Sequence, residues 1–125
     1  MSTYSRNKGK QHERDLAEWM SRVSGTKYRR VPMSGALHLD WPGDVMKIGR
    51  EDSVFDGVLP EAKNCNQISV PKWIGQTEGS ALDAGLSRWF ICFRYQAKHY
   101  YILPGNYFEE LIKKARQEAE PKTQD

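Results

Sequence analysis

The sequence is poor in the residues that mark several large classes of protein. It has only two cysteines, Cys65 and Cys92, both in apolar, strand-like surroundings. This excludes a disulfide framework or a cysteine-rich zinc site, and we expect two buried, reduced thiols. His12, His38 and His99 lack the spacing of metal ligands and are expected on the surface or in packing. The chain also has no apolar run long enough to cross a membrane, and its polar start lacks the apolar core of a signal peptide. These absences predict a cytoplasmic protein.

What is present suffices for one ordinary domain. The 125 residues are 38% hydrophobic and 28% charged, with a net charge of +3. The charge is uneven, because residues 1–30 hold eight lysines and arginines against three acids, whereas the remaining 95 residues hold eleven against thirteen. A basic end on a nearly neutral body is expected for phosphate contact. A solvated tail kept basic for solubility fits the charge equally well.

Apolar periodicity and chain breakers predict eight elements in the order α-β-β-β-α-β-β-α. The expected helices cover about 11–23, 69–85 and 106–117, with Ser69 and Asn106 as N-caps. The expected strands cover 28–31, 44–48, 53–65, 88–96 and 99–103. We expect a flexible basic arm over 1–10, a domain over 11–117 and a polar tail over 118–125. The order suggests an α/β fold with a mixed central β-sheet flanked by helices on both faces.

One strand-like stretch, residues 58–65, carries the clearest chemical signal. Side chains alternate along a strand, so Glu61 and Lys63 share a face about 7 Å apart. A carboxylate can hold a divalent cation there, and a lysine can orient water or steady charge on a phosphate. By itself Glu-x-Lys occurs by chance in many strands. A hairpin could place Asp44 beside Glu61, although the sequence does not fix the register.

Three other carboxylates are candidates for the same site. Glu13 lies three residues before Leu16 and so in line with the apolar stripe of its helix. A favourable interaction with the helix dipole explains Glu13 about as well. Asp56 is five residues from Glu61, which puts it on the opposite strand face. Asp40 lies in a loop, where a turn-forming role is the simpler interpretation.

Taken in order, Glu13, Asp44, Glu61 and Lys63 resemble the motif of the PD-(D/E)XK nuclease superfamily. More closely, the chain is similar to archaeal-type Holliday junction resolvases, in a form that a phage could encode. The resemblance covers roughly residues 6–103. It rests on five segments: Arg6-x-Lys8-Gly9, Glu13-Arg14, Arg30 at a strand end, Ser34-Gly35-Ala36, and Asp44 followed by Glu61-x-Lys63.

The resemblance implies a restriction-endonuclease-like core and a Mg²⁺-dependent endonuclease, with Mn²⁺ as a substitute. Lys63 would position the attacking water, and Ser34 resembles a serine that contacts the cleaved strand. The implied metal ligands are Asp44, Glu61, the carbonyl of Ala62 and, through water, Glu13. The implied DNA-binding residues are Arg6, Lys8, Lys10, Arg14, Arg29 and Arg30.

The implied substrate is branched DNA, a four-way junction above all. A junction needs two symmetric incisions, which a homodimer supplies. Trp73, Ile74 and Leu82 of the expected middle helix, or the sheet edge, are candidate interface residues. Two alternatives stay open: a nicking or flap endonuclease of the same superfamily, and a non-catalytic DNA-binding module with this fold. The chain departs from the family pattern at Pro60, whose missing N–H is awkward inside a sheet unless a bulge lies there.

Overall fold

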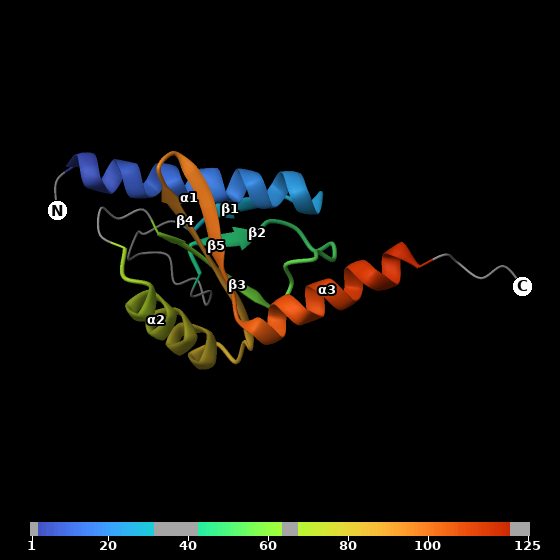
Figure 1. The fold of residues 1–125 in the computed structure, drawn as a ribbon. Helices are drawn as coiled ribbons and strands as arrows, with labels where there is room; N and C mark the ends of the chain where they lie inside the picture. Colours follow the sequence, from blue (N-terminus) through green and yellow to red (C-terminus); the bar gives the residue numbers. More distant parts are fainter. Residues whose placement is uncertain (1–2, 32–42, 64–67, 121–125) are drawn as a thin grey trace, which may run out of the picture.

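The computed structural model describes residues 3–31, 43–63 and 68–120 (Figure 1). The predicted order of elements is confirmed, and so is the α/β class with a mixed sheet and three helices. None of the helices in the described part of the chain is both long and apolar enough to cross a membrane. The elements are α1 (Thr3–Ser24), β1 (Tyr28–Arg30), β2 (Val45–Lys47), β3 (Val58–Lys63), α2 (Val70–Asp83), β4 (Arg88–Tyr95), β5 (Lys98–Ile102) and α3 (Gly105–Ala119).

The described strands form two small sheets that meet at one point. β1 pairs with β2 in antiparallel register, whereas β4 lies between a parallel β3 and an antiparallel β5. The parallel pair needs a crossover, which α2 provides. The backbone N–H of Asp44 donates to the carbonyl of Pro60 over 3.2 Å and joins the start of β2 to the middle of β3.

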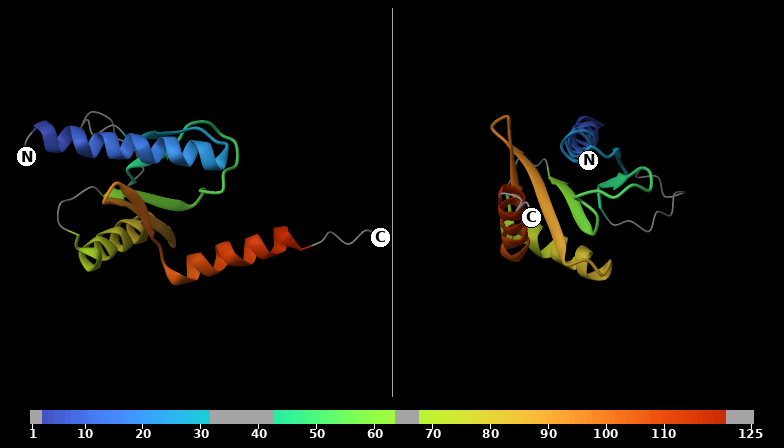
Figure 2. Two further views of the ribbon diagram at one scale, coloured as in Figure 1. Left: turned by 45° about the horizontal axis from the view of Figure 1, so that its top comes forward. Right: turned by 90° about the vertical axis from the view of Figure 1, so that its right-hand side faces the viewer.

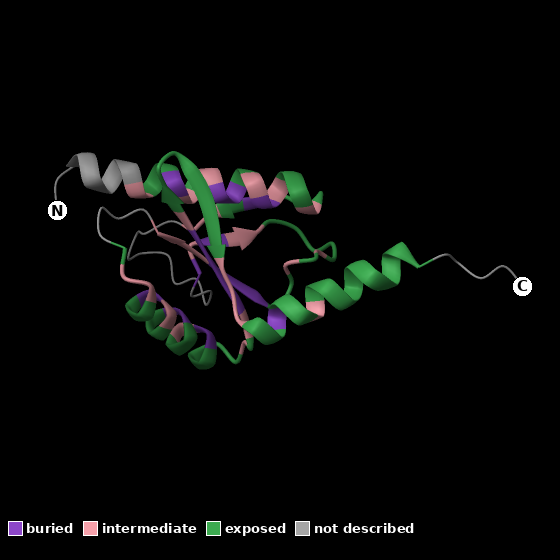
Figure 3. Cartoon of the chain, viewed as in Figure 1, coloured by how far each residue is buried: buried purple, intermediate pink, exposed green. Residues whose placement is uncertain are grey.

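The three-stranded sheet is covered by α1 on one face and α2 on the other (Figures 1 and 2). The alternation of side chains along β3 and β4 sends neighbouring residues to opposite cores. Buried residues toward α1 include Leu16, Met20, Val58, Phe90 and Cys92. Buried residues toward α2 include Leu59, Trp73, Ala81, Trp89 and Ile91. Figure 3 shows these inner faces as buried and most of α3 as exposed.

Helix α1 begins at Thr3, so most of the stretch expected to be a flexible arm is helical. The periodicity marked only the packed part of the helix, because residues 3–10 carry no apolar stripe. Arginine and lysine are good helix formers, and a helix nucleated by packing extends into them at little cost. Gly9 opposes this extension by only about 1 kcal/mol.

Two other boundaries differ from prediction. β3 starts at Val58, five residues late, because residues 53–56 form a turn closed by the Asp56 N–H and the Ser53 carbonyl at 3.0 Å. The prediction of Asn106 as a cap was wrong. Helix α3 begins at Gly105 directly after Pro104, whose extended backbone occupies the N-cap position. Ser69 is at the N-cap of α2 as predicted, but its side chain makes no capping hydrogen bond.

Pro60 fits into β3 without a bulge because its missing donor faces away from β4. In an extended strand the N–H and C=O of one residue leave the same edge. The carbonyl of Pro60 accepts from Asp44, so the Pro60 nitrogen also faces the seam between the two sheets. A proline is tolerated at such an edge.

A histidine of α1 and a cysteine of β4 are buried where these two elements pack together. Cys92 is buried on β4, as predicted, whereas Cys65 lies outside the described residues. His12 is also buried, its Nε2 lies 3.2 Å from the carbonyl oxygen of Cys92, and burial lowers its pKa. Trp73 is only 5% exposed and packs in the core, so it is not available to a partner subunit.

Candidate active site

Asp44 is fixed at the seam between the two sheets by its main chain and its side chain. Its N–H donates to the Pro60 carbonyl, and its own carbonyl accepts from Val31 N–H over 2.8 Å. Its Oδ2 accepts from the backbone N–H of Ala62 over 2.8 Å. The side chain of Asp44 therefore lies against the same stretch of β3 that carries Glu61. The hairpin expected to bring them together is not formed, because β2 pairs with β1 and β3 with β4.

Glu61 is hydrogen-bonded to this aspartate. Burial, the negative charge of Asp44 and the hydrogen bond to Asp44 together raise the pKa of Glu61 to about 8, although the charge of Lys63 opposes the rise. Two adjacent carboxylates cannot both ionise cheaply, so the pair holds a proton at neutral pH when no cation is bound. The site is thus built with an excess of negative charge.

Glu13 approaches the pair from α1. Its side chain is 17% exposed and its Oε1 accepts from Nε of Arg30 over 3.2 Å, so the prediction that Glu13 points inward is confirmed. Burial and then the charge of Asp44 raise the pKa of Glu13, whereas Arg30 lowers it. The negative charge of Asp44 raises the pKa of both glutamates, so the three carboxylates act on one another.

Strand β3 supplies the other two groups of the site. Lys63 shares the face of Glu61, and its charge reaches that carboxylate. Because the N–H of Ala62 points to Asp44, the carbonyl of Ala62 leaves the strand toward the same seam. One short segment therefore presents a carboxylate, a carbonyl and an ammonium beside Asp44.

The remaining predicted residues are divided between exposed and undescribed positions. Lys10, Arg14 and Arg29 are exposed, and the charge of Lys10 reaches Glu13. Arg6 and Lys8 lie in the first turns of α1, but their side chains, like Ser34 and the rival Asp40, lie outside the described residues. The other rival, Asp56, forms an ion pair with Lys47 at 2.7 Å instead of joining the site.

The pairing of Arg30 with Glu13 was not predicted from the sequence. Arg30 was assigned to DNA from the resemblance, yet its guanidinium Nε is bound to a glutamate 17 positions away. No sequence signal links the two residues, because their contact depends on how α1 packs over β1. Arg30 is therefore positioned to hold Glu13, whatever it contributes to DNA contact.

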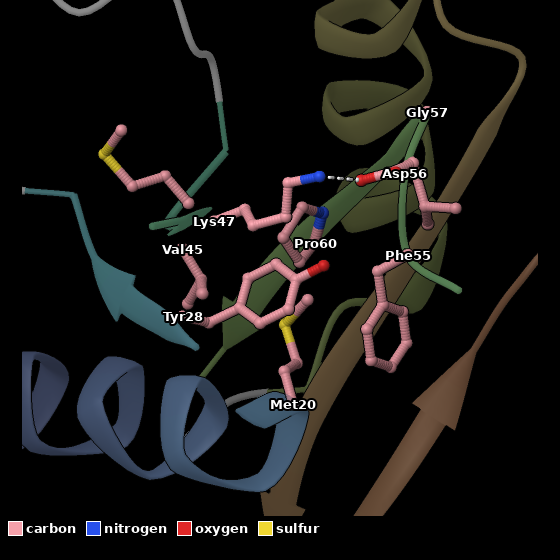
Figure 4. A pocket seen from close by; sticks show the side chains of 10 residues that line it. Met20, Tyr28, Val45, Lys47, Phe55, Asp56, Gly57 and Pro60 are labelled. Atoms are coloured by element: carbon pink, nitrogen blue, oxygen red, sulfur yellow. Dashed lines mark hydrogen bonds and ion pairs between the residues drawn. The ribbon is translucent and has the colours of Figure 1, made fainter. Parts of the chain in front are cut away.

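A pocket of about 240 Å³ lies outside this cluster, between the end of α1, β2 and the turn before β3 (Figure 4). Apolar side chains such as Met20, Tyr28 and Phe55 line it, and the Lys47–Asp56 ion pair sits at its rim. Glu13, Glu61 and Lys63 are not part of its lining. The hollow is a gap in packing beside the seam and not the carboxylate site.

The donor atoms at the seam suit a hard cation. Asp44, Glu61 and the carbonyl of Ala62 offer only oxygen, which Mg²⁺ prefers, and Mg²⁺ keeps several waters when protein ligands are few. A cation would also relieve the repulsion that raises the pKa of Glu61. Among residues 3–31, 43–63 and 68–120, no three His, Cys, Asp or Glu side chains are grouped as direct ligands.

A mixed sheet between helices, with two hydrogen-bonded carboxylates and a lysine on one seam, is the core of a PD-(D/E)XK nuclease. The model of the family described as "Phage putative PDDEXK endonuclease" matches residues 4–124, and the chain belongs to that family. Nucleases of this class typically use a divalent metal and act on DNA. No curated protein and no solved structure gives a significant match to the chain.

Proposed function

We propose that the protein is a Mg²⁺-dependent endonuclease that resolves four-way DNA junctions as a homodimer, by paired symmetric nicks. The observation that carries the catalytic part is the hydrogen-bonded pair Asp44–Glu61, with Lys63 on the same face. The junction preference is supported by the order of motifs from Arg6 to Lys63, which resembles that of the archaeal-type resolvases. Mn²⁺ would substitute for Mg²⁺, since both favour oxygen ligands.

Asp44, Glu61 and the Ala62 carbonyl would hold the metal, and Glu13 would hold one of its waters. The bound cation supplies charge stabilisation on the phosphate and a more acidic water. Lys63 donates hydrogen bonds that orient the attacking water or neutralise a phosphate oxygen. Water oxygen bonds to phosphorus, the bond from phosphorus to the leaving oxygen breaks, and a proton passes to that oxygen.

The exposed basic residues would bring the DNA to this site. Lys10, Arg14 and Arg29 are free of the close ion pair that holds Arg30, and arginine forks suit phosphate oxygens. With Arg6 and Lys8 they form the basic end of the chain. Ser34 would contact the cleaved strand. Each phosphate contact should appear as a salt-dependent share of the affinity.

The test is a cleavage panel of a four-way junction, a flap and a linear duplex, with Mg²⁺ and with chelator. Asp44→Asn serves as the cleavage-dead control, because it keeps the shape of the side chain. The proposal expects symmetric nicks on the junction, little cutting of the duplex and none in chelator. Preferred cutting of flaps would favour the alternative of a nicking or flap enzyme. Junction binding without cleavage under any metal would favour a non-catalytic module.

A further inference from the structure

Helix α3 presents an apolar stripe that is largely exposed. Phe108, Leu111 and Ile112 are 54%, 39% and 53% exposed, and Ala115 continues the row. Their spacing of three, four and seven residues puts them on one side of the helix. Of the described residues of α3, only Tyr107 is buried. Two views show α3 running away from the sheet along most of its length (Figures 1 and 2).

The charges beside the stripe are arranged by sign along the helix. Glu109, Lys113 and Arg116 are spaced four and three residues apart, so they form a row along one side of the stripe. Glu109 lies near the start of α3 and the two basic residues lie in its second half, and Glu120 continues the row at the C-cap. In an antiparallel pair related by a two-fold axis, such a row faces the same row of the partner with its ends exchanged.

We propose that α3 is a dimerisation helix that binds α3 of a second copy in antiparallel orientation. With the two-fold axis between Leu111 and Ile112, these two side chains pack around the centre, and Phe108 covers the partner subunit's Ala115. Glu109 then lies level with the partner subunit's Lys113 and Arg116. A parallel pair would set like charges opposite one another, so the charge pattern selects the antiparallel form.

Two features of α3 leave these groups available to a partner. Arg116 forms an ion pair with Glu120 at 3.5 Å, but the two side chains are 82% and 61% exposed, and such a surface pair is readily exchanged. Glu110, by contrast, is engaged with Arg88 at 2.8 Å and anchors the start of the helix to β4. The helix is therefore held at one end, and its apolar row points outward.

The α3 pairing would form the interface of the dimer in the proposed function, on which it rests. Separate results can overturn the pairing and the proposed function. Oligomeric state is measured on the protein without DNA or metal. A dimer that is insensitive to changes in α3 and still resolves junctions would overturn the α3 pairing alone. A dimer through α3 that cuts no junction would overturn the proposed substrate alone.

The first arm of the experiment removes the apolar contact. Light scattering after size exclusion, over a series of protein concentrations, should show a dimer for the wild-type chain. Ile112→Asn should weaken association by about tenfold or more, because it places an amide at the centre of the contact. Val23→Asn is the matched control, since Val23 is 52% exposed on α1 and lies outside the contact. Circular dichroism checks that both variants keep their helices.

The second arm tests the orientation by charge reversal. Glu109→Arg and Arg116→Glu should each disfavour the homodimer, whereas an equimolar mixture of the two variants should form a heterodimer in which both charge pairs are attractive, one reversed and one as in the wild type. Glu78→Arg on α2 makes the same charge change away from α3 and should have no effect. A monomeric wild-type chain, a dimer insensitive to Ile112→Asn, or no recovery in the mixture would each overturn the proposal.

Discussion

Replacing Glu61 by glutamine should stabilise the metal-free protein at alkaline pH. At low pH the carboxyl of Glu61 is neutral in both the folded and the unfolded chain, so its ionisation does not change the free energy of unfolding. As pH rises above the ordinary value of 4.5, the unfolded chain loses this proton while the folded chain keeps it up to about pH 8. The unfolded state then binds fewer protons, so the free energy of unfolding falls across this window and levels off above it.

The magnitude follows from the same two values. The difference between 4.5 and about 8 sets an upper limit of about 5 kcal/mol, at about 1.4 kcal/mol per pH unit. Glu61 is only partly buried and regains hydration when it ionises, so we expect roughly 1–3 kcal/mol. The amide that Glu61→Gln introduces can still donate to Asp44, as the protonated acid does, and the variant should lack the pH slope.

The assay is urea unfolding in chelator at pH 5, 7 and 9. Glu78→Gln, an exposed change on α2, is the control. His12 has a lowered pKa, so its contribution to the free energy of unfolding is lost as pH falls. This contribution is the same in every variant and therefore cancels in the comparison. Added Mg²⁺ should stabilise the wild-type chain at pH 9 more than it stabilises the Glu61→Gln variant. An equal slope in the wild type and in Glu61→Gln would refute the reasoning, because the pair would then not hold a proton.

Four further outcomes are expected. Chelator should stop cleavage, whereas Ca²⁺ should support DNA binding without turnover, which a cleavage assay beside a binding assay will show. Asp44→Asn and Lys63→Ala should abolish cutting but keep DNA affinity within about tenfold, and a much larger loss of affinity would contradict their role. Arg30→Met should raise the pKa of Glu13 and move the acid limb of the pH–rate profile to higher pH, while an unmoved limb would mean that Glu13 does not take part. Ala97→Gly should stabilise the protein by about 0.5–1 kcal/mol in thermal unfolding, because Ala97 has a φ of 63° in the β4–β5 turn.

The order of elements was predictable because each core-forming segment carries its own period. The closeness of Asp44 to Glu61 was also anticipated, but the expected hairpin was wrong, because β2 pairs with β1 and Asp44 reaches β3 from the start of β2. The start of α1 was not predictable, because its first turns do not contribute to the core and therefore show no apolar periodicity. The hydrogen bond between Arg30 and Glu13 was not predictable either, because it depends on a helix lying across a strand end. Local patterns report what a segment buries, not which polar groups meet after packing.

The proline of β3 has a consequence for how the two sheets stay apart. A strand approaching β3 from the β2 side finds no donor at Pro60 and gains one hydrogen bond fewer than a normal edge would give. The two sheets therefore meet without pairing into one continuous five-stranded sheet. The next backbone donor, at Ala62, is taken by a side chain of Asp44 instead of a strand. Pro60→Val would restore the missing donor, and the carboxylates would then have to compete with main chain for the space in which a cation can sit.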